Sequence, residues 1–188
     1  DFINIVNENN IDMVIIAGDI YDTSNPPAQA ERLFYKTVSK LANNGQRCVL
    51  IISGNNDNPE RLAAVTPLAH EQGIIILVNP LSCTEIARYN GFEIVEAKEV
   101  CVKLKINDEK VVAITLPYPS ERRLNKAMLK NDEDKEKQQT YSQKIGEVFT
   151  QLQSHFEKDS INIVISHLFV TGGEITGSER PIELGGNL

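Results

Sequence analysis

Two polar motifs follow apolar segments of the chain and carry residue types that bind metal ions. Segment 12–17 ends just before Asp19, and segment 47–53 ends just before Asn55. Apolar runs of this length predict parallel strands buried on both faces, and open α/β sheets bind ligands at the carboxyl ends of such strands. Because carboxylate and amide oxygens suit hard divalent cations, the pattern predicts a metal site at one edge of a sheet.

A third candidate ligand, His167, follows the apolar segment 161–166. A lone histidine at a strand end is more often an ordinary surface or core residue. Here we expect it to be the third strand end of one sheet that presents a ligand beside Asp19 and Asn55. Together they would form a mixed oxygen and nitrogen site that suits manganese, iron or zinc.

The segments between these motifs predict the elements that hold them in place. Apolar residues recur at helical spacing over segments 1–10, 28–42, 59–70 and 141–156. Strands are expected over 12–17, 47–53, 74–78 and 161–166, and the order of the first three implies parallel pairing with right-handed crossovers. Alternation over 100–106 and its return over 111–116 predict an antiparallel hairpin, which suits the second sheet of a two-sheet sandwich.

The composition fits a single domain in a reducing cytoplasm. The chain has 188 residues, with 19 Lys and Arg against 26 Asp and Glu, so its net charge is −7. That charge is unpromising for a DNA-binding protein unless metal ions offset it, basic residues cluster or a partner supplies a basic surface. The three cysteines, Cys48, Cys83 and Cys101, lack metal-type spacing, and no apolar run is long enough to cross a membrane.

The motifs resemble those of the calcineurin-like metallophosphoesterases. Three of that family's motifs, G-D-x-x-D, G-N-H-D or -E, and a lone histidine, correspond in order to residues 18–22, residues 54–57 and His167. The flanking segments 25–27, 58–62 and 167–181 are similar to the SbcD group of bacterial nuclease subunits, and the likeness covers essentially the whole chain.

This resemblance implies an α/β fold built as a two-sheet α/β/β/α sandwich, forming a single nuclease domain over residues 1–188. We expect the domain to be incomplete at both ends, because the family's first D-x-H motif and last G-H-x-H motif are missing. The chain also begins with Asp1 and not with Met. We therefore expect residues 1–188 alone to show little or no activity.

The resemblance also assigns roles to single residues. Asp19 would bridge two divalent metal ions, with Mn²⁺ as the expected metal, while Asn55 would bind the second ion and His167 one of the two. Asp57 would support the site from behind the ligands, and Asp22 would do the same. Two ions can activate water and stabilise both the entering and the leaving oxygen, so no protein base is required.

The implied function is metal-dependent hydrolysis of DNA, as an exonuclease on ends and an endonuclease on hairpins. The expected partners are DNA and an SbcC-type ATPase subunit, with a homodimer inside a heterotetramer of a cytoplasmic repair complex and no membrane. Arg61 either contacts the DNA backbone or is a surface arginine of a helix, and the sequence leaves both open.

Asn56 departs from the family pattern, which has a histidine at this position. That histidine is thought to protonate the leaving group or to steady the scissile phosphate, whereas an asparagine donates hydrogen bonds but does not titrate near neutral pH. Three explanations stay open: this branch works without the proton donor, the position was engineered, or activity is low. Two other function classes also stay open: a phosphatase or cyclic-nucleotide phosphodiesterase, and a non-catalytic scaffold with a degraded site.

Overall fold

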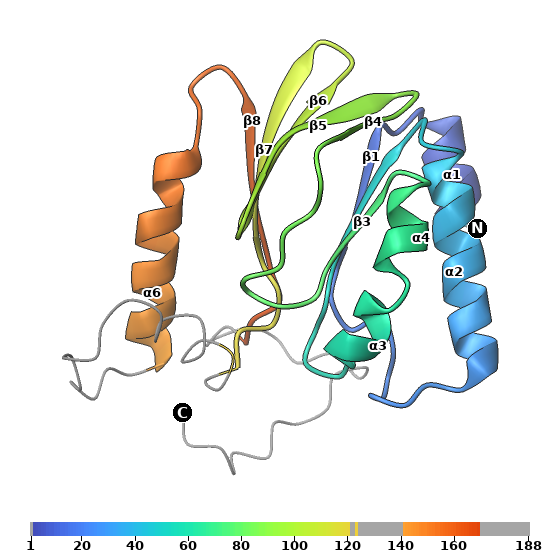
Figure 1. Ribbon diagram of the computed structural model, residues 1–188, viewed down its shortest axis with the longest axis horizontal. Helices are drawn as coiled ribbons and strands as arrows, with labels where there is room; N and C mark the ends of the chain where they lie inside the picture. Colours follow the sequence, from blue (N-terminus) through green and yellow to red (C-terminus); the bar gives the residue numbers. More distant parts are fainter. Residues whose placement is uncertain (1, 121–122, 124–140, 170–188) are drawn as a thin grey trace.

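The apolar run Cys48–Ile52 forms β2, the central strand of the first sheet, and all five of its residues are buried. It pairs in parallel with β1 (Met13–Ala17) on one side and with β3 (Ile74–Leu77) on the other. The computed structural model describes residues 2–120, 123 and 141–169 (Figure 1). The predicted charged segment 126–139 and glycine-rich tail 171–188 lie outside the described residues.

The second sheet has five strands in the order β4-β5-β6-β7-β8. Their bounds are β4 (Ala87–Arg88), β5 (Phe92–Lys98), β6 (Cys101–Ile106), β7 (Glu109–Leu116) and β8 (Ile161–Ser166). Neighbouring strands run antiparallel except β7 and β8, which run parallel. Side chains of both sheets share one core, in which Leu50 and Ile52 pack with Leu104 and Ala113.

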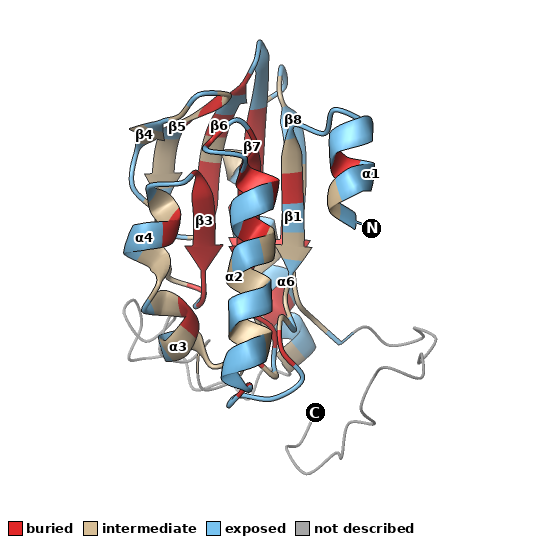
Figure 2. Ribbon diagram, turned by 90° about the vertical axis from the view of Figure 1, so that its right-hand side faces the viewer, coloured by how far each residue is buried: buried red, intermediate tan, exposed pale blue. Residues whose placement is uncertain are grey.

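Helices cover the outer face of each sheet, so the layers run α/β/β/α as predicted (Figure 1). The first sheet is covered by α1 (Phe2–Glu8), α2 (Ala28–Ala42), α3 (Pro59–Ala63) and α4 (Thr66–His70). The second is covered by α6 (Tyr141–Leu152), which continues as the short 3₁₀ helix η1 (Gln153–His155). Figure 2 shows the buried strand β3 in the layer behind the partly exposed helices α2 and α4. Within the described residues, no helix is both long and apolar enough to cross a membrane.

Several predicted elements need correction. The single helix predicted over 59–70 is two helices, because Pro67 has no N–H and its ring would clash with the carbonyl of Ala63 in a continuous helix. The helix predicted over 141–156 is α-helical only to Leu152. Val100 has a left-handed φ of 62° and lies in the turn before β6, so the alternation begins one residue later.

Two further expectations concern single side chains. The helical spacing over 28–42 puts Leu33 on the apolar side that should face the core, but Leu33 is 66% exposed. Cys48 lies in an apolar strand and was expected to be a small core residue, which the structure confirms: it is fully buried, and burial raises the pKa of its thiol to about 12. The two-residue strand β4 was not predicted, because a segment this short carries no alternation to detect.

Candidate metal centre

The loops that carry Asp19 and Asn55 leave the first sheet side by side. Ala17 at the end of β1 is in register with Ile52 at the end of β2, so the following turns meet at one edge of the sheet. Their glycines allow a close approach. A Cβ atom added to Gly54 would overlap the carboxylate and the backbone nitrogen of Asp19. Only glycine can bring the two loops this close.

The buried carboxylate of Asp57 connects the two loops through hydrogen bonds to their backbones. Its carboxylate accepts hydrogen bonds from the backbone N–H groups of Gly54 at 2.7 Å, Tyr21 at 3.1 Å and Ile20 at 3.2 Å. The side chain is buried, with 3% of its surface exposed. All three donors come from the metal loops, so Asp57 fixes one loop against the other. This geometry is what the predicted supporting role of Asp57 requires.

His167 reaches the same place from the other sheet. It follows β8, which pairs with β7 in the five-stranded sheet and not with β1 or β2, so the expectation of three strand ends in one sheet was wrong. Its Nε2 atom lies 2.9 Å from Oδ1 of Asn55 and 3.5 Å from Oδ1 of Asp19. The three predicted ligands therefore do come together, at the junction of the two sheets.

The contacts of His167 leave an electron-rich point at the centre of the site. Its Nδ1 lies 2.9 Å from the carbonyl oxygen of Ala17, which can only accept, so the proton belongs on Nδ1 and the lone pair on Nε2. That lone pair faces two oxygen acceptors. The amide nitrogen of Asn55 donates to Oδ1 of Asn56 at 3.3 Å, which turns the Asn55 oxygen toward the histidine. Asp19 Oδ1 also accepts the backbone N–H of Asn56, and its remaining lone pair converges with Nε2 and with Asn55 Oδ1, an arrangement that fits a bound cation.

Among the described residues, no three His, Cys, Asp or Glu side chains gather in one place. The third ligand of this group is the amide oxygen of Asn55, an oxygen donor that divalent metals accept. Asp19 itself has a left-handed backbone with φ of 47°, a conformation that Asp tolerates better than most residues. A strained residue held in place by its neighbours is common at functional sites.

Asn56 donates two hydrogen bonds to the carboxylate of Asp19. Its backbone N–H donates to Oδ1 and its side-chain amide donates to Oδ2, both at 3.1 Å. No pattern in the sequence indicates this contact, because it depends on the turn that places Asn56 over the neighbouring loop. Asn56 thus fixes the direction in which Asp19 presents its oxygens.

The other candidates from the sequence lie at the side of this group. The guanidinium of Arg61 donates to both carboxylate oxygens of Glu31, at 2.5 and 3.0 Å, and to Oδ1 of Asn25 at 2.8 Å. The Arg61 hydrogen bond lowers the pKa of Glu31. These bonds join α3 to α2 and to the loop after β1, as a structural arginine would. Asp22 is exposed, and its supporting role stays a prediction.

Tyr118 is a site neighbour that the sequence did not reveal. Leu116 at the end of β7 is in register with Ser166 at the end of β8, which brings Tyr118 beside His167. The two rings meet edge to face, with centroids 6.2 Å apart. The sequence did not predict that β7 pairs with β8, and this pairing is what places the residues after both strands at the same edge of the sheet.

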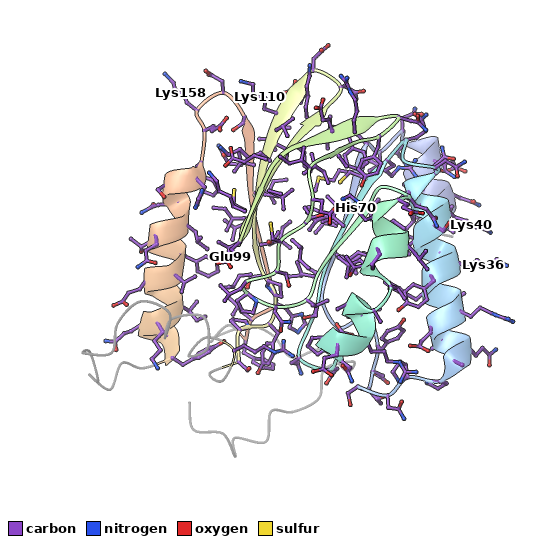
Figure 3. The ribbon with its side chains drawn as sticks, in the orientation of Figure 1. Lys36, Lys40, His70, Glu99, Lys110 and Lys158 are labelled. Carbon is purple, nitrogen blue, oxygen red and sulfur yellow. The ribbon has the colours of Figure 1, made fainter. Side chains whose placement is uncertain are left out.

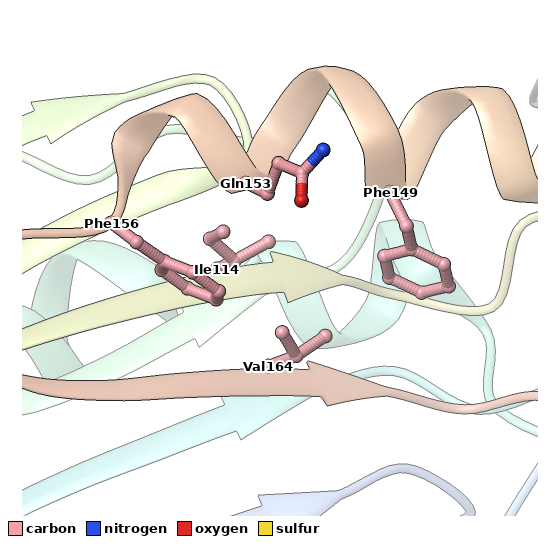
Figure 4. A pocket seen from close by; sticks show the side chains of 5 residues that line it. All are labelled: Ile114, Phe149, Gln153, Phe156 and Val164. Carbon is pink, nitrogen blue, oxygen red and sulfur yellow. The ribbon is translucent and has the colours of Figure 1, made fainter.

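An apolar hollow of about 270 Å³ lies elsewhere, between α6 and the sheet. It is lined by Ile114, Phe149, Gln153, Phe156 and Val164 (Figure 4). None of these side chains is charged, and the amide of Gln153 is the one polar group among them. The hollow is a packing feature beneath α6, and the chemistry belongs to the edge where β1, β2 and β8 end.

The chain belongs to the calcineurin-like phosphoesterase family, which it matches over residues 1–183. Divalent metal ions are the cofactors of this family, and Asp19, Asn55 and His167 offer the donors to hold them.

Within the family, the chain is 38% identical over 182 residues to the SbcD subunit of the nuclease SbcCD from Bacillus subtilis (strain 168). It is 27% identical over 175 residues to the protein of the same name from Staphylococcus epidermidis (strain ATCC 12228 / FDA PCI 1200). The matches cover 97% and 93% of this chain but 43% and 40% of the relatives, so the chain spans less than half their length. The resemblance predicted from the motifs is confirmed.

Proposed function

We propose that this chain carries metal ligands of a DNA nuclease that hydrolyses phosphodiester bonds. The observation that carries the proposal is the position of His167 Nε2, which lies 2.9 Å from Asn55 Oδ1 and 3.5 Å from Asp19 Oδ1. This group lies at the carboxyl ends of strands from two sheets, where α/β proteins bind their ligands. The relatives named as nuclease subunits point to DNA as the substrate.

In this proposal two divalent ions, with Mn²⁺ as the metal, supply an activated water and offset the charge of the phosphate. The chain's own residues would hold the ions and orient the ligand atoms. Asp19 offers two oxygens whose direction Asn56 fixes, and Asp57 keeps the two loops together. The carbonyl of Ala17 holds the His167 ring in the tautomer that presents Nε2.

We further propose that the protein acts on DNA ends and hairpins in the cytoplasm, with an SbcC-type ATPase subunit and as a homodimer within a heterotetramer. The names of the relatives support a second subunit, while the action on DNA ends and hairpins, the oligomeric state and the cytoplasm are taken from the family resemblance. Lys36 and Lys40 project from the outer side of α2, while Lys110 and Lys158 lie at the end opposite the site, at the start of β7 and before β8 (Figure 3). With a net charge of −7, the chain would attract DNA through metal ions, a local cluster of basic residues or a basic partner surface.

Metal titration tests the site directly. We expect the full-length protein to bind Mn²⁺ and cleave a linear DNA duplex, and Asp19→Ala to weaken Mn²⁺ binding at least about 100-fold and abolish cleavage, since it removes a two-oxygen ligand. Asp108→Ala, in the exposed turn before β7, is the matched control and should leave both unchanged. Undiminished Mn²⁺ binding by Asp19→Ala would show that the site lies elsewhere.

The substrate class is tested in the same assay. Cleavage of bis(p-nitrophenyl) phosphate without cleavage of DNA would favour a small-molecule phosphodiesterase instead. If the wild-type protein cleaved neither substrate and bound Mn²⁺ weakly, a non-catalytic scaffold would be favoured. Asn56 is consistent with that alternative, because it replaces the histidine of the family pattern.

Asn56 has its own test. We propose that it positions Asp19 and does not transfer a proton, so a titratable side chain at this position should speed the reaction. A well-placed general acid contributes about 10²- to 10⁴-fold, and we expect Asn56→His to raise kcat at least about tenfold on DNA. An unchanged kcat would show that a proton donor at this position is not limiting.

A further inference from the structure

A groove of about 830 Å³, lined by polar residues and by Pro59, Pro80 and Leu81, opens beside Asp57, the residue that joins the two loops. Its walls come from the segments that follow β1, β2, β3 and β7, all of which end at the edge that carries the metal site. The polar residues that line it include Ser24, Asn58, Asn79, Ser82, Ser120 and Arg123. The groove therefore continues the candidate metal centre along the same edge of the molecule.

Arg123 is the cation of this groove. Its Nη1 donates to the carbonyl oxygen of Tyr118 at 3.1 Å, and its guanidinium carbon lies 5.9 Å from the centre of the Tyr118 ring. The same ring meets the ring of His167 edge to face. One aromatic side chain thus separates Arg123 from a proposed metal ligand. A guanidinium carries five N–H donors, and the hydrogen bond to Tyr118 uses one of them.

The hydroxyl groups of the groove are also set up as donors. Ser82 Oγ accepts from the N–H groups of Val78 and Asn79, and Ser120 Oγ accepts from the N–H of Arg123. A hydroxyl whose oxygen already accepts still has its proton to donate.

The two carboxylates of the groove differ in what they do. Asp57 is buried, and its oxygens accept three backbone N–H groups, while its charge also acts on the nearby guanidinium of Arg123. Glu60 is exposed to solvent at the start of α3. The inner wall therefore offers hydroxyl donors and one guanidinium, a combination that suits phosphate oxygens.

We propose that this groove holds the sugar-phosphate backbone of the strand being cut, beyond the scissile bond, and that Arg123 anchors one of its phosphates. The proposal rests on the proposed nuclease function and adds to it a positioning residue for the substrate. Such a residue should matter for a long substrate and not for a small one that ends at the metal site. That difference makes the proposal testable.

The experiment compares Arg123→Ala, Arg123→Lys and the control Arg88→Ala in the full-length protein with Mn²⁺. Arg88 lies on β4 with 82% of its side chain exposed, and it does not line the groove. Each variant is assayed on a labelled DNA duplex at several salt concentrations and on bis(p-nitrophenyl) phosphate. Thermal unfolding of each variant checks that the fold is retained.

For Arg123→Ala we expect KM on DNA to rise about tenfold, kcat/KM on the small diester to stay within about twofold, and the salt slope to fall by about 0.9 for the lost phosphate contact. Arg123→Lys should recover most of the KM, and Arg88→Ala should match the wild type. An unchanged KM on DNA, or an equal loss on both substrates, would overturn the proposal. A wild-type protein that cuts the small diester but not DNA would refute the nuclease function itself.

Discussion

Single residues around the metal centre show that backbone hydrogen bonds, and not only apolar packing, hold the site together. The loops after β1 and β2 contain few large apolar side chains and approach too closely for a Cβ at Gly54. Their geometry depends on the carboxylate of Asp57 and on the two hydrogen bonds that Asn56 donates to Asp19. Removal of either contact should therefore disturb the site, and removal of the buried Asp57 carboxylate should also weaken the fold.

Asp57→Ala should lower the free energy of unfolding by about 3 kcal/mol, because it leaves the buried N–H groups of Ile20, Tyr21 and Gly54 without an acceptor. Urea denaturation measures this loss. Asp108→Ala, at an exposed turn, should change the free energy of unfolding by less than about 0.5 kcal/mol. If Asp57→Ala were as stable as that control, the carboxylate would not be what holds the loops.

Two glycines give a matched pair of substitutions with opposite outcomes. Gly54→Ala places a methyl group against the carboxylate of Asp19 and should weaken Mn²⁺ binding at least about tenfold, as measured by calorimetric titration. Gly146→Ala, in α6, meets no atom within 4 Å and should raise the free energy of unfolding by about 0.5 to 1 kcal/mol. Normal Mn²⁺ binding by Gly54→Ala would mean that the loops can separate without affecting the ligands.

At the scale of strands and helices, the sequence predicts what is local and misses what depends on pairing. The runs 13–17, 48–52 and 161–166 are apolar enough to be recognised as strands, and the polar residues after them as candidate ligands, but the prediction of burial on both faces is right only for 48–52, since Ile15, Ile161 and Val164 are exposed. Sheet membership is different, because a buried strand has the same pattern in either sheet. His167 was therefore predicted as a ligand but placed in the wrong sheet, and Tyr118 was missed.

Ion pairs join the elements of the second sheet on its exposed side. Lys103 on β6 contacts Glu96 on β5 at 3.0 Å and Glu157, in the loop before β8, at 2.9 Å, while Lys98 contacts Glu96 at 2.6 Å. The hydrogen bonds from Lys98 and Lys103 lower the pKa of Glu96 from its ordinary 4.5 to about 2. A lowered pKa stabilises the fold above pH 4.5, and this contribution is lost as the pH falls toward 2.

Lys103→Met should therefore be less stable than the wild type at about pH 6, and the difference should shrink at about pH 2.5, where Glu96 is becoming protonated in both proteins. Urea unfolding at the two pH values measures the difference. Lys105→Met, an exposed position on the same strand, is the control and should show no such pH dependence. A difference that stayed constant with pH would assign the effect to packing of the Lys103 stem.

At the scale of the whole molecule, the proposed metal centre lies where the two sheets meet. Asp19 and Asn55 belong to loops of the three-stranded sheet, and His167 belongs to the five-stranded sheet. The sheets share an apolar core along their length, while at this edge they meet through polar side chains. An ion bound by all three residues would add a link between the sheets that exists only in the folded protein.

Metal binding should therefore stabilise the whole fold and not only the loops. At a Mn²⁺ concentration about 100 times Kd, the free energy of unfolding should rise by about 2.7 kcal/mol, because the ion binds the folded state alone. In His167→Ala most of this gain should disappear, since the ligand from the second sheet is lost, whereas His155→Ala, in η1, should keep it. Chemical denaturation of the full-length protein with and without Mn²⁺ measures the gain. An equal gain in His167→Ala would mean that Mn²⁺ is held by one sheet only and does not link the two.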